Sequence, residues 1–326
     1  MKRFFTSNGI SPVDISHKLN TLQLHQQAMK RPALQNEIEP ANINQPETYI
    51  YAVGYIHAKF PNLNLEKEFN QAKTLANKNS PLLADVNDEV ALAHANRNKN
   101  LNSEIYSTLI KPENNYIARE MNWTFSNSDG NETYKVIPPS HQGLYELISA
   151  LAPNTSNNNK GGNDVAQQVI IIGVESRETD SLAFSHIIPV SQEAITQSIS
   201  QAAGTTNINN TYMTELVSEI LSLNGNDGYN HGDRALNYAL YNNWQIYLKA
   251  YELLYASSSN GPNPNGYQLV NVRITGDSSS NRLVAKLIFD FQGINSGATQ
   301  SWYCAVDVSG EYPFLLTDMA RFLARD

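Results

Sequence analysis

The longest amphipathic pattern in the chain runs from His231 to Tyr255. Large apolar residues recur there at spacings of 4, 4, 3, 4 and 3, at Leu236, Leu240, Trp244, Tyr247, Tyr251 and Leu254. This period matches one face of an α-helix, and the asparagines and charged residues of the stretch lie mostly outside that face. The pattern predicts one continuous helix over 231–255 that packs its rings into a core, with Trp244 in the middle of the buried stripe.

Shorter segments have the composition of β-strands. Residues 48–60, 167–174 and 181–190 are rich in β-formers, and 118–139 predict a hairpin that turns around Asn127–Gly130. Three successive strands with short polar turns, at 267–275, 282–291 and 299–308, predict an antiparallel meander. Residues 311–326 are expected to form a short terminal helix.

Helical segments separate these strands. They are expected near residues 62–77, 81–119, 141–151, 191–202 and 211–223, with Ser140 as the N-cap of the third. Strands and helices do not alternate regularly, and the last sheet is local in sequence. The chain is therefore predicted to be α+β, with mixed helices and an antiparallel sheet that includes a C-terminal three-stranded meander, rather than a doubly wound parallel fold.

The chain divides into an arm and a folded domain. In residues 1–48, Ile15, Leu19, Leu22 and Met29 form a short amphipathic stripe, and three prolines follow it. The stripe suits either a helix that docks on a partner or one that packs on its own domain. Residues 49–326 are expected to form one α+β domain, interrupted by an asparagine-rich, mobile loop at 153–164.

Composition excludes several protein classes. A net charge of −8 and a pI near 5.4 disfavour nucleic-acid binding, which needs a basic surface. The apolar run at 169–174 is too short to cross a bilayer, and the N-terminus has no apolar stretch like that of a signal peptide. A single cysteine, Cys304, allows no intramolecular disulfide. We expect a cytoplasmic protein that binds neither nucleic acid nor membrane.

Known catalytic signatures are missing from the sequence. It has no dinucleotide-binding or phosphate-binding glycine motif, no His-Glu-x-x-His and no Gly-x-Ser-x-Gly. Cys304 lies in a predicted strand, where a cysteine is usually an inert apolar residue. The histidines are scattered without metal-ligand spacing. We therefore predict no cofactor, no metal and no assigned catalytic residue.

Five polar residues remain candidates for a pocket or partner site. His231 and Asp233 could form a general acid–base pair beside Arg234, although Asp233 as a plain helix cap is the favoured interpretation. Glu66 and Glu68 are the other two candidates, and acidic residues in a first helical turn are more often solvated charges that suit the helix dipole.

Four segments carry a family resemblance. They are "YAVGYIHAKFPNLNLEKEF" (51–69), "YIAREMNW" (116–123), "DRALNYALYNNWQIY" (233–247) and "WYCAVDVSGEYPFLLTDM" (302–319). Together they resemble, in the same order, the domain of unknown function that ends the cyanobactin maturation proteins PatG and PatA, over about residues 49–322. The resemblance implies a role in clusters that cut and cyclise ribosomal peptides.

The chain departs from that family in two respects. No His-Gly-Thr or Gly-Thr-Ser segment of a subtilisin-like protease is present, and the chain has its own N-terminal arm and asparagine-rich loop. Protease activity is therefore not implied, and the family offers no catalytic residues for this domain.

Three functional hypotheses remain open from the sequence. The first is a non-catalytic module that binds a protein or peptide partner and forms a homo-oligomer, most simply a dimer, in peptide maturation. The second is an undescribed enzyme that uses the His231/Asp233 region or the two glutamates. The third is a structural subunit of a larger assembly joined through the arm.

Overall fold

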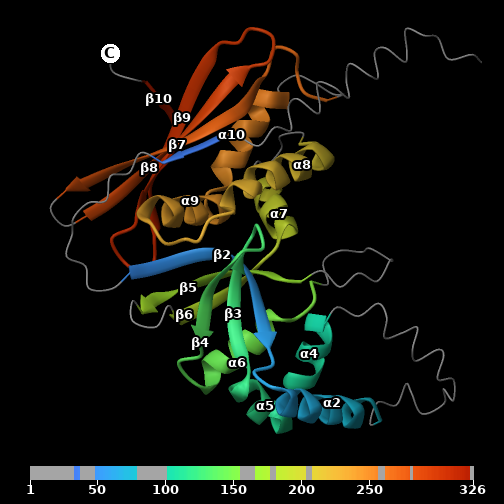
Figure 1. The fold of residues 1–326 in the computed structure, drawn as a ribbon. Coiled ribbons are helices and arrows are strands. Elements are labelled where there is room, and N and C mark those ends of the chain that lie inside the picture. Colours follow the sequence, from blue (N-terminus) through green and yellow to red (C-terminus); the bar gives the residue numbers. More distant parts are fainter. Residues whose placement is uncertain are drawn as a thin grey trace, which may run out of the picture.

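The computed structural model contains two β-sheets, each with its own helices, that follow one another along the length of the molecule (Figure 1). The structure describes residues 33–36, 48–78, 101–154, 166–176, 181–202, 208–255, 261–279 and 282–323. Helices and mainly antiparallel strands occur in both halves, so the α+β class predicted from the sequence is confirmed.

The first sheet is a closed barrel with the strand order β2-β3-β4-β6-β5. Its strands are β2 (Thr48–Lys59), β3 (Asn122–Asn127), β4 (Glu132–Ile137), β5 (Gln168–Ser176) and β6 (Ser181–Val190). All neighbours pair antiparallel except β4 and β6, which are parallel. The predicted hairpin of β3 and β4 is confirmed, with its turn at Gly130 in the left-handed conformation that glycine favours.

Short helices pack against the barrel. They are α2 (Leu63–Lys78), α4 (Leu101–Leu109), the 3₁₀ turn η2 (Pro112–Asn114), α5 (Asn115–Glu120) and α6 (His141–Ala150). Ser140 is the N-cap of α6, and its hydroxyl accepts a hydrogen bond from the amide of Gly143 at 3.1 Å, as predicted. Apolar residues of these helices and of the strands form one buried core.

The second sheet has the order β1-β7-β8-β9-β10. Its strands are β1 (Ala33–Asn36), β7 (Tyr267–Ser279), β8 (Arg282–Gly293), β9 (Thr299–Asp307) and β10 (Phe314–Phe322). Helices that contribute to its core are α7 (Gln192–Ala202), α8 (Asn210–Leu221), the 3₁₀ turn η3 (Ser222–Asn224), α9 (His231–Asn242) and α10 (Trp244–Tyr255). Figure 1 shows α9 lying between this sheet and the barrel.

The position of strand β5 between two hydrophobic clusters explains its unbroken apolar run. Val169 and Ile171 belong to the core inside the barrel, whereas Ile170 and Ile172 point outward and pack with residues of α9. All four are buried. A strand with two covered faces carries apolar residues at every position instead of alternating.

The C-terminal segment is a strand, and the predicted terminal helix is wrong. β10 pairs antiparallel with β9, so the predicted three-stranded meander has four strands. The Leu, Met, Ala and Arg residues of this segment favour a helix locally. The edge of β9, however, presents backbone N–H and C=O groups that pair with β10 and that a helix at this position would leave unpaired. Tertiary pairing therefore overrides the local preference.

The predicted continuous helix over 231–255 is also wrong, because it is broken into α9 and α10 at Asn243. The backbone of Asn243 leaves the helical region (φ −115°, ψ 86°), and its side-chain oxygen accepts from the amide of Gln245 at 3.2 Å. Asparagine competes with the helix for backbone hydrogen bonds, which favours a break at this point. Trp244 consequently begins a new helix and is only half-buried, whereas Tyr247 is fully buried.

The predicted arm contributes one described element, β1, which pairs in parallel with residues 271–274 of β7. This part of the arm therefore joins the sheet and is not a free linker. The amphipathic stripe predicted at residues 15–29 lies outside the described residues, as does most of the asparagine-rich loop, whose two ends meet in a bridge between Pro153 and Ala166.

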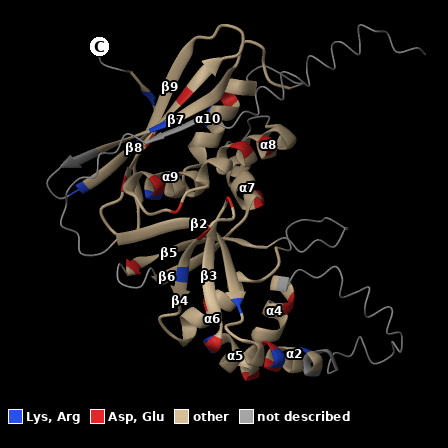
Figure 2. Ribbon diagram, viewed as in Figure 1, with Lys and Arg blue, Asp and Glu red and all other residues tan. Residues whose placement is uncertain are grey.

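Charged residues are distributed unevenly over the second half of the molecule. Figure 2 shows acidic positions on α7 and α8, and neither helix contains lysine or arginine. Among the described residues, no helix has the length and apolar character needed to cross a membrane.

Candidate functional site

The three candidates His231, Asp233 and Arg234 lie in the first turn of α9. The N-cap is Asn230 rather than Asp233, since the Asn230 side chain accepts from the Asp233 amide at 2.8 Å. The amide group of Asn230 in turn donates to the Asp233 carboxylate at 2.8 Å. This reciprocal pair differs from a capping box, because the Asn230 side chain rather than its backbone N–H donates to the carboxylate, but Asp233 still supports the helix start as its third residue.

Arg234 holds the chain that follows β9. Its side chain is 1% exposed and donates to the backbone carbonyls of Val308 at 2.9 Å, of Glu311 at 3.2 Å and of Gly310. The guanidinium also lies 5.5 Å from the ring centroid of Tyr49 in β2. Burial lowers the pKa of Arg234 to about 10, so the group is still charged at neutral pH. Arg234 thus fixes a loop of the second sheet beside the first strand of the barrel.

Burial shifts the other two candidates toward their neutral forms. It raises the pKa of Asp233 to about 6, and the nearby Asp227 acts in the same direction while the hydrogen bond from Asn230 opposes it. Burial, followed by the charge of Arg234, lowers the pKa of His231. The Nδ1 atom of His231 is buried and has no hydrogen-bond partner in the described part of the chain.

Asp233→Asn should stabilise the protein at neutral pH and not at acid pH. Because the folded-state pKa is raised above the ordinary value near 3.8, the folded state binds this proton more tightly than the unfolded state. The associated stability is present below about pH 4 and is lost as the pH rises to about 6. We expect the variant to gain about 1–3 kcal/mol in free energy of unfolding at pH 7 and little below pH 4.

Urea denaturation of both proteins from pH 4 to pH 8 measures this difference. Asp318→Asn serves as a control, because it makes the same substitution at an exposed position. Glu219, whose pKa burial raises to about 7, is present in all three proteins and cancels from the comparison. A stability difference that does not change with pH would contradict the buried-carboxyl explanation.

The loop before α9 completes a joint between the two halves, made of residues 224–230 and the first two turns of α9. Its Gly228 carbonyl accepts from the amide of Tyr51 in β2 at 3.1 Å. Asn237, fully buried in α9, donates to the Tyr51 carbonyl at 2.9 Å and exchanges amide hydrogen bonds with Asn226 at 2.8 and 3.0 Å. The joint therefore extends the backbone pairing of the barrel into the second half.

Asp227 attaches the same loop to the hairpin of the barrel. Its carboxylate accepts from the side-chain amide of Asn127 at 3.0 Å, and its carbonyl accepts from the Tyr134 hydroxyl at 2.8 Å. Side chains of β3 and β4 and the backbone of β2 thus contact two consecutive residues of one loop, Asp227 and Gly228. Asp233 and Arg234, two of the candidates from the sequence, therefore have structural roles in the joint.

Glu66 and Glu68 do not join this group. Both are exposed on α2, at the end of the barrel opposite to α9 (Figure 1). The structure therefore brings together His231, Asp233 and Arg234 and leaves the two glutamates on a separate surface.

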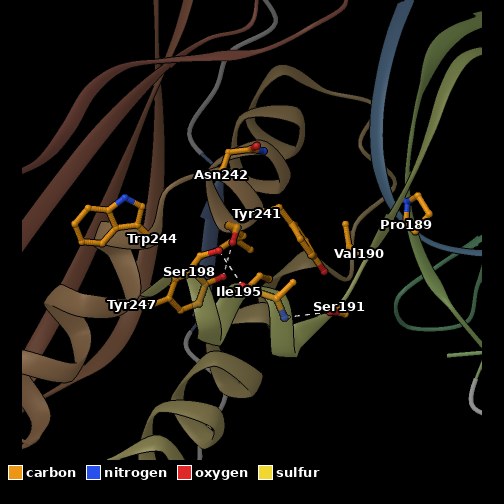
Figure 3. A pocket seen from close by; sticks show the side chains of 11 residues that line it. Pro189, Val190, Ser191, Ile195, Ser198, Tyr241, Asn242, Trp244 and Tyr247 are labelled. Carbon is orange, nitrogen blue, oxygen red and sulfur yellow. Dashed lines mark hydrogen bonds between the residues drawn. The ribbon is translucent and has the colours of Figure 1, made fainter. Parts of the chain in front are cut away.

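A cleft lies where the end of β6 and helix α7 face the α9–α10 break (Figure 3). Its volume is about 350 Å³, and it is lined by Pro189, Val190, Ser191, Ala194, Ile195, Ser198, Leu240, Tyr241, Asn242, Trp244 and Tyr247. None of the five sequence candidates belongs to this set. Every side chain that lines the cleft is of an uncharged type, so the site favours contact with neutral groups over proton transfer.

Sequence reasoning missed the cleft because it treated 231–255 as one helix. The break at Asn243 separates α10 from α9 and leaves the rings of Tyr241 and Trp244 beside a hollow, with the buried Tyr247 behind them. The adjacent Asn242 and Asn243 were the available signal, since paired asparagines in an apolar helical stripe favour a break.

No group of three His, Cys, Asp or Glu side chains suited to a metal ion occurs among the residues that the structure describes. Cys304 is buried in β9, and burial raises the pKa of its thiol to about 12. At neutral pH this thiol is protonated, which makes it a poor nucleophile and metal ligand.

Comparisons with known proteins identify both halves. The family model described as "PatG Domain" matches residues 49–188, and the model described as "PatG C-terminal" matches residues 204–322. A solved structure, "PatG Domain of Unknown Function", aligns with a TM-score of 0.55 and 15% sequence identity over 84% of this chain and 98% of that chain. At that identity the likeness concerns the fold alone. No curated protein matches the chain.

Proposed function

The chain belongs to the PatG C-terminal family, and from this premise we propose that it is a non-catalytic accessory module that binds a protein or peptide partner in ribosomal peptide maturation. In this proposal the module is cytoplasmic. It forms a homodimer, because most soluble oligomers are symmetric and dimers are the commonest of them. The two matched domains are themselves of unknown function, so the proposal depends on the geometry of this chain.

The single observation that supports a non-catalytic role is the engagement of Asp233 and Arg234 in the joint. A general acid or base must reach a substrate proton directly or through one water molecule. Asp233 instead accepts from the side chain of the N-cap Asn230, and Arg234 is directed at three backbone carbonyls with 1% of its surface exposed. These contacts stabilise the attachment of the two halves.

The cleft supports binding as the activity of the module. It combines aromatic and aliphatic walls with hydroxyl groups and one carboxamide, the composition typical of sites that bind small ligands. An enzyme remains the alternative, because the buried Nδ1 atom of His231 has no partner in the described part of the chain.

A peptide library tests the proposal on the full-length protein. We expect a subset of peptides to co-elute with the protein in size-exclusion chromatography, and mass spectrometry should find their masses unchanged. Light scattering of the same peak should give twice the mass of one chain.

Cleavage or modification of a peptide that disappears in His231→Ala would replace the proposal with the enzyme alternative. Failure to retain any peptide, together with a strict monomer at high concentration, would contradict the binding module itself.

A further inference from the structure

We infer that the cleft between α7 and the α9–α10 break binds one uncharged aromatic or large aliphatic residue of an extended peptide. This inference rests on the proposed function in one respect, since it takes the partner to be a peptide. The site is defined by its eleven lining residues, whose charge, size and hydrogen-bonding groups determine the ligand that it accepts.

The lack of charged side chains in the lining of the cleft favours neutral ligands. All eleven lining residues are uncharged types, and burial raises the pKa of Tyr241 and of Tyr247 so that both phenols stay neutral. A charged side chain that entered would lose hydration without gaining a counter-charge. Anions are disfavoured further because α7 and α8 carry glutamates and no basic residue (Figure 2).

The size of the cleft matches a single residue. About 350 Å³ lies at the small end of the range of roughly 300–1,000 Å³ that ligand sites occupy. The rings of Tyr241 and Trp244 and the side chains of Val190 and Ile195 form the walls, and the fully buried Tyr247 lies behind them. Figure 3 shows Ile195 and Ser198 of α7 below Tyr241 and Asn242 of α9, so the hollow is enclosed from two elements. An aromatic ring or a branched aliphatic side chain, together with its own backbone, fits within such a space.

Two serines at the rim offer a donor and an acceptor. The Ser191 hydroxyl oxygen accepts from the amide of Ala194 at 3.1 Å, which leaves its proton to donate. The Ser198 hydroxyl donates to the Ala194 carbonyl at 2.9 Å, which leaves its oxygen to accept. A residue in an extended peptide presents one carbonyl and one amide, the complementary pair. This match favours a peptide residue over a hydrocarbon.

The walls are preformed. The Tyr241 hydroxyl accepts from Asn224 at 2.7 Å and donates to the Gln168 side chain at 3.1 Å, so its ring is held from η3 and from β5. The Tyr247 hydroxyl donates to the Leu240 carbonyl at 2.5 Å across the helix break. A ligand that enters a site with fixed rings orders few side chains, which reduces the cost of binding.

The experiment follows the Trp244 indole N–H signal in NMR spectra of the full-length, ¹⁵N-labelled protein, assigned through Trp244→Phe. The probes are the blocked tripeptides acetyl-Ala-Phe-Ala-amide, acetyl-Ala-Glu-Ala-amide and acetyl-Ala-Lys-Ala-amide, with N-acetyl-phenylalaninamide as a single residue. We expect the phenylalanine tripeptide to shift the signal with saturation, and both charged tripeptides to bind at least about ten-fold more weakly.

Ser198→Phe fills the cleft and should weaken binding of the phenylalanine tripeptide at least about ten-fold. Gln197→Phe is the matched control, because it adds the same ring at an exposed position of α7 outside the lining and should change affinity less than about two-fold. Thermal midpoints establish that both variants fold. If Ser198→Phe does not fold, Ala194→Leu replaces it, because this substitution narrows the same cleft from the preceding turn of α7.

The outcomes separate this inference from the proposed function. Equal affinity for charged and neutral tripeptides, or unchanged affinity in Ser198→Phe, overturns the cleft as the site. Library peptides that bind while the Trp244 signal stays fixed leave the proposed function standing and overturn the inference. Binding of N-acetyl-phenylalaninamide without any tripeptide overturns the extended peptide as the ligand of the cleft, and the peptide library then decides the proposed function separately.

Discussion

Tyr247→Ala should lower the free energy of unfolding by about 3–5 kcal/mol, the usual cost of truncating a fully buried aromatic residue. Tyr247 has no exposed surface, and its hydroxyl donates to the Leu240 carbonyl at 2.5 Å. Truncation would remove the ring from the core of the second half and would leave that carbonyl without its donor. Because folded domains are stable by only about 5–15 kcal/mol, the variant should unfold at much lower urea concentration.

Trp244→Ala is the comparison that makes this result informative. Trp244 is half-buried and faces the cleft on one side, so its truncation should cost about 1–2 kcal/mol, well below the value for a buried ring. Tyr247→Phe should lose about 1 kcal/mol, since it removes only the hydroxyl group. Urea denaturation followed by circular dichroism measures all three. Equal costs for Trp244→Ala and Tyr247→Ala would contradict the break at Asn243 and favour one continuous helix.

Gly228→Ala should destabilise the protein by about 2–5 kcal/mol through the joint. Gly228 has a φ of +64°, where a side chain costs about 1–2 kcal/mol. An added Cβ would also lie 2.2 Å from the carbonyl oxygen of Tyr51 and 2.7 Å from the Cα of Ala52. Both contacts are backbone atoms of β2, so the loop would have to separate from the barrel and lose the hydrogen bond from the Tyr51 amide.

Gly297→Ala provides a closely matched control. Gly297 has a φ of +65°, and an added Cβ there would meet no atom within 4 Å. This variant should cost only the conformational term of about 1–2 kcal/mol. The difference between the two midpoints in urea therefore isolates the close approach of the joint to the barrel. Equal destabilisation by the two variants would show that the joint tolerates a methyl group and is not a tight contact.

Local sequence patterns determined the elements whose partners are near in the chain. The hairpin of β3 and β4 follows from two apolar runs around a polar turn, and the start of α6 follows from Ser140 three residues before the amide that it caps. The β-formers of β5 predicted a strand, and the four quoted segments indicated the family that the comparisons then matched. These signals are contained within short windows of sequence, so no knowledge of the fold was needed.

Contacts between distant residues decided the rest. Arg234 follows the pattern of a first-turn residue, yet its partners are carbonyls 74 to 77 positions later, so its role in the joint exists only once β9 has folded beside α9. β10 became a strand because the edge of β9 was available to it, against its local helical preference.

The candidate site depended on tertiary structure for the same reason. The break at Asn243 turns one predicted apolar stripe into two helices, which buries Tyr247 and exposes Trp244 to the cleft. The opposite wall of the cleft comes from β6 and α7, about 50 residues earlier in the chain. Local periodicity specifies which side chains share a helix face, whereas the packing of separate elements decides whether that face meets a core or a hollow.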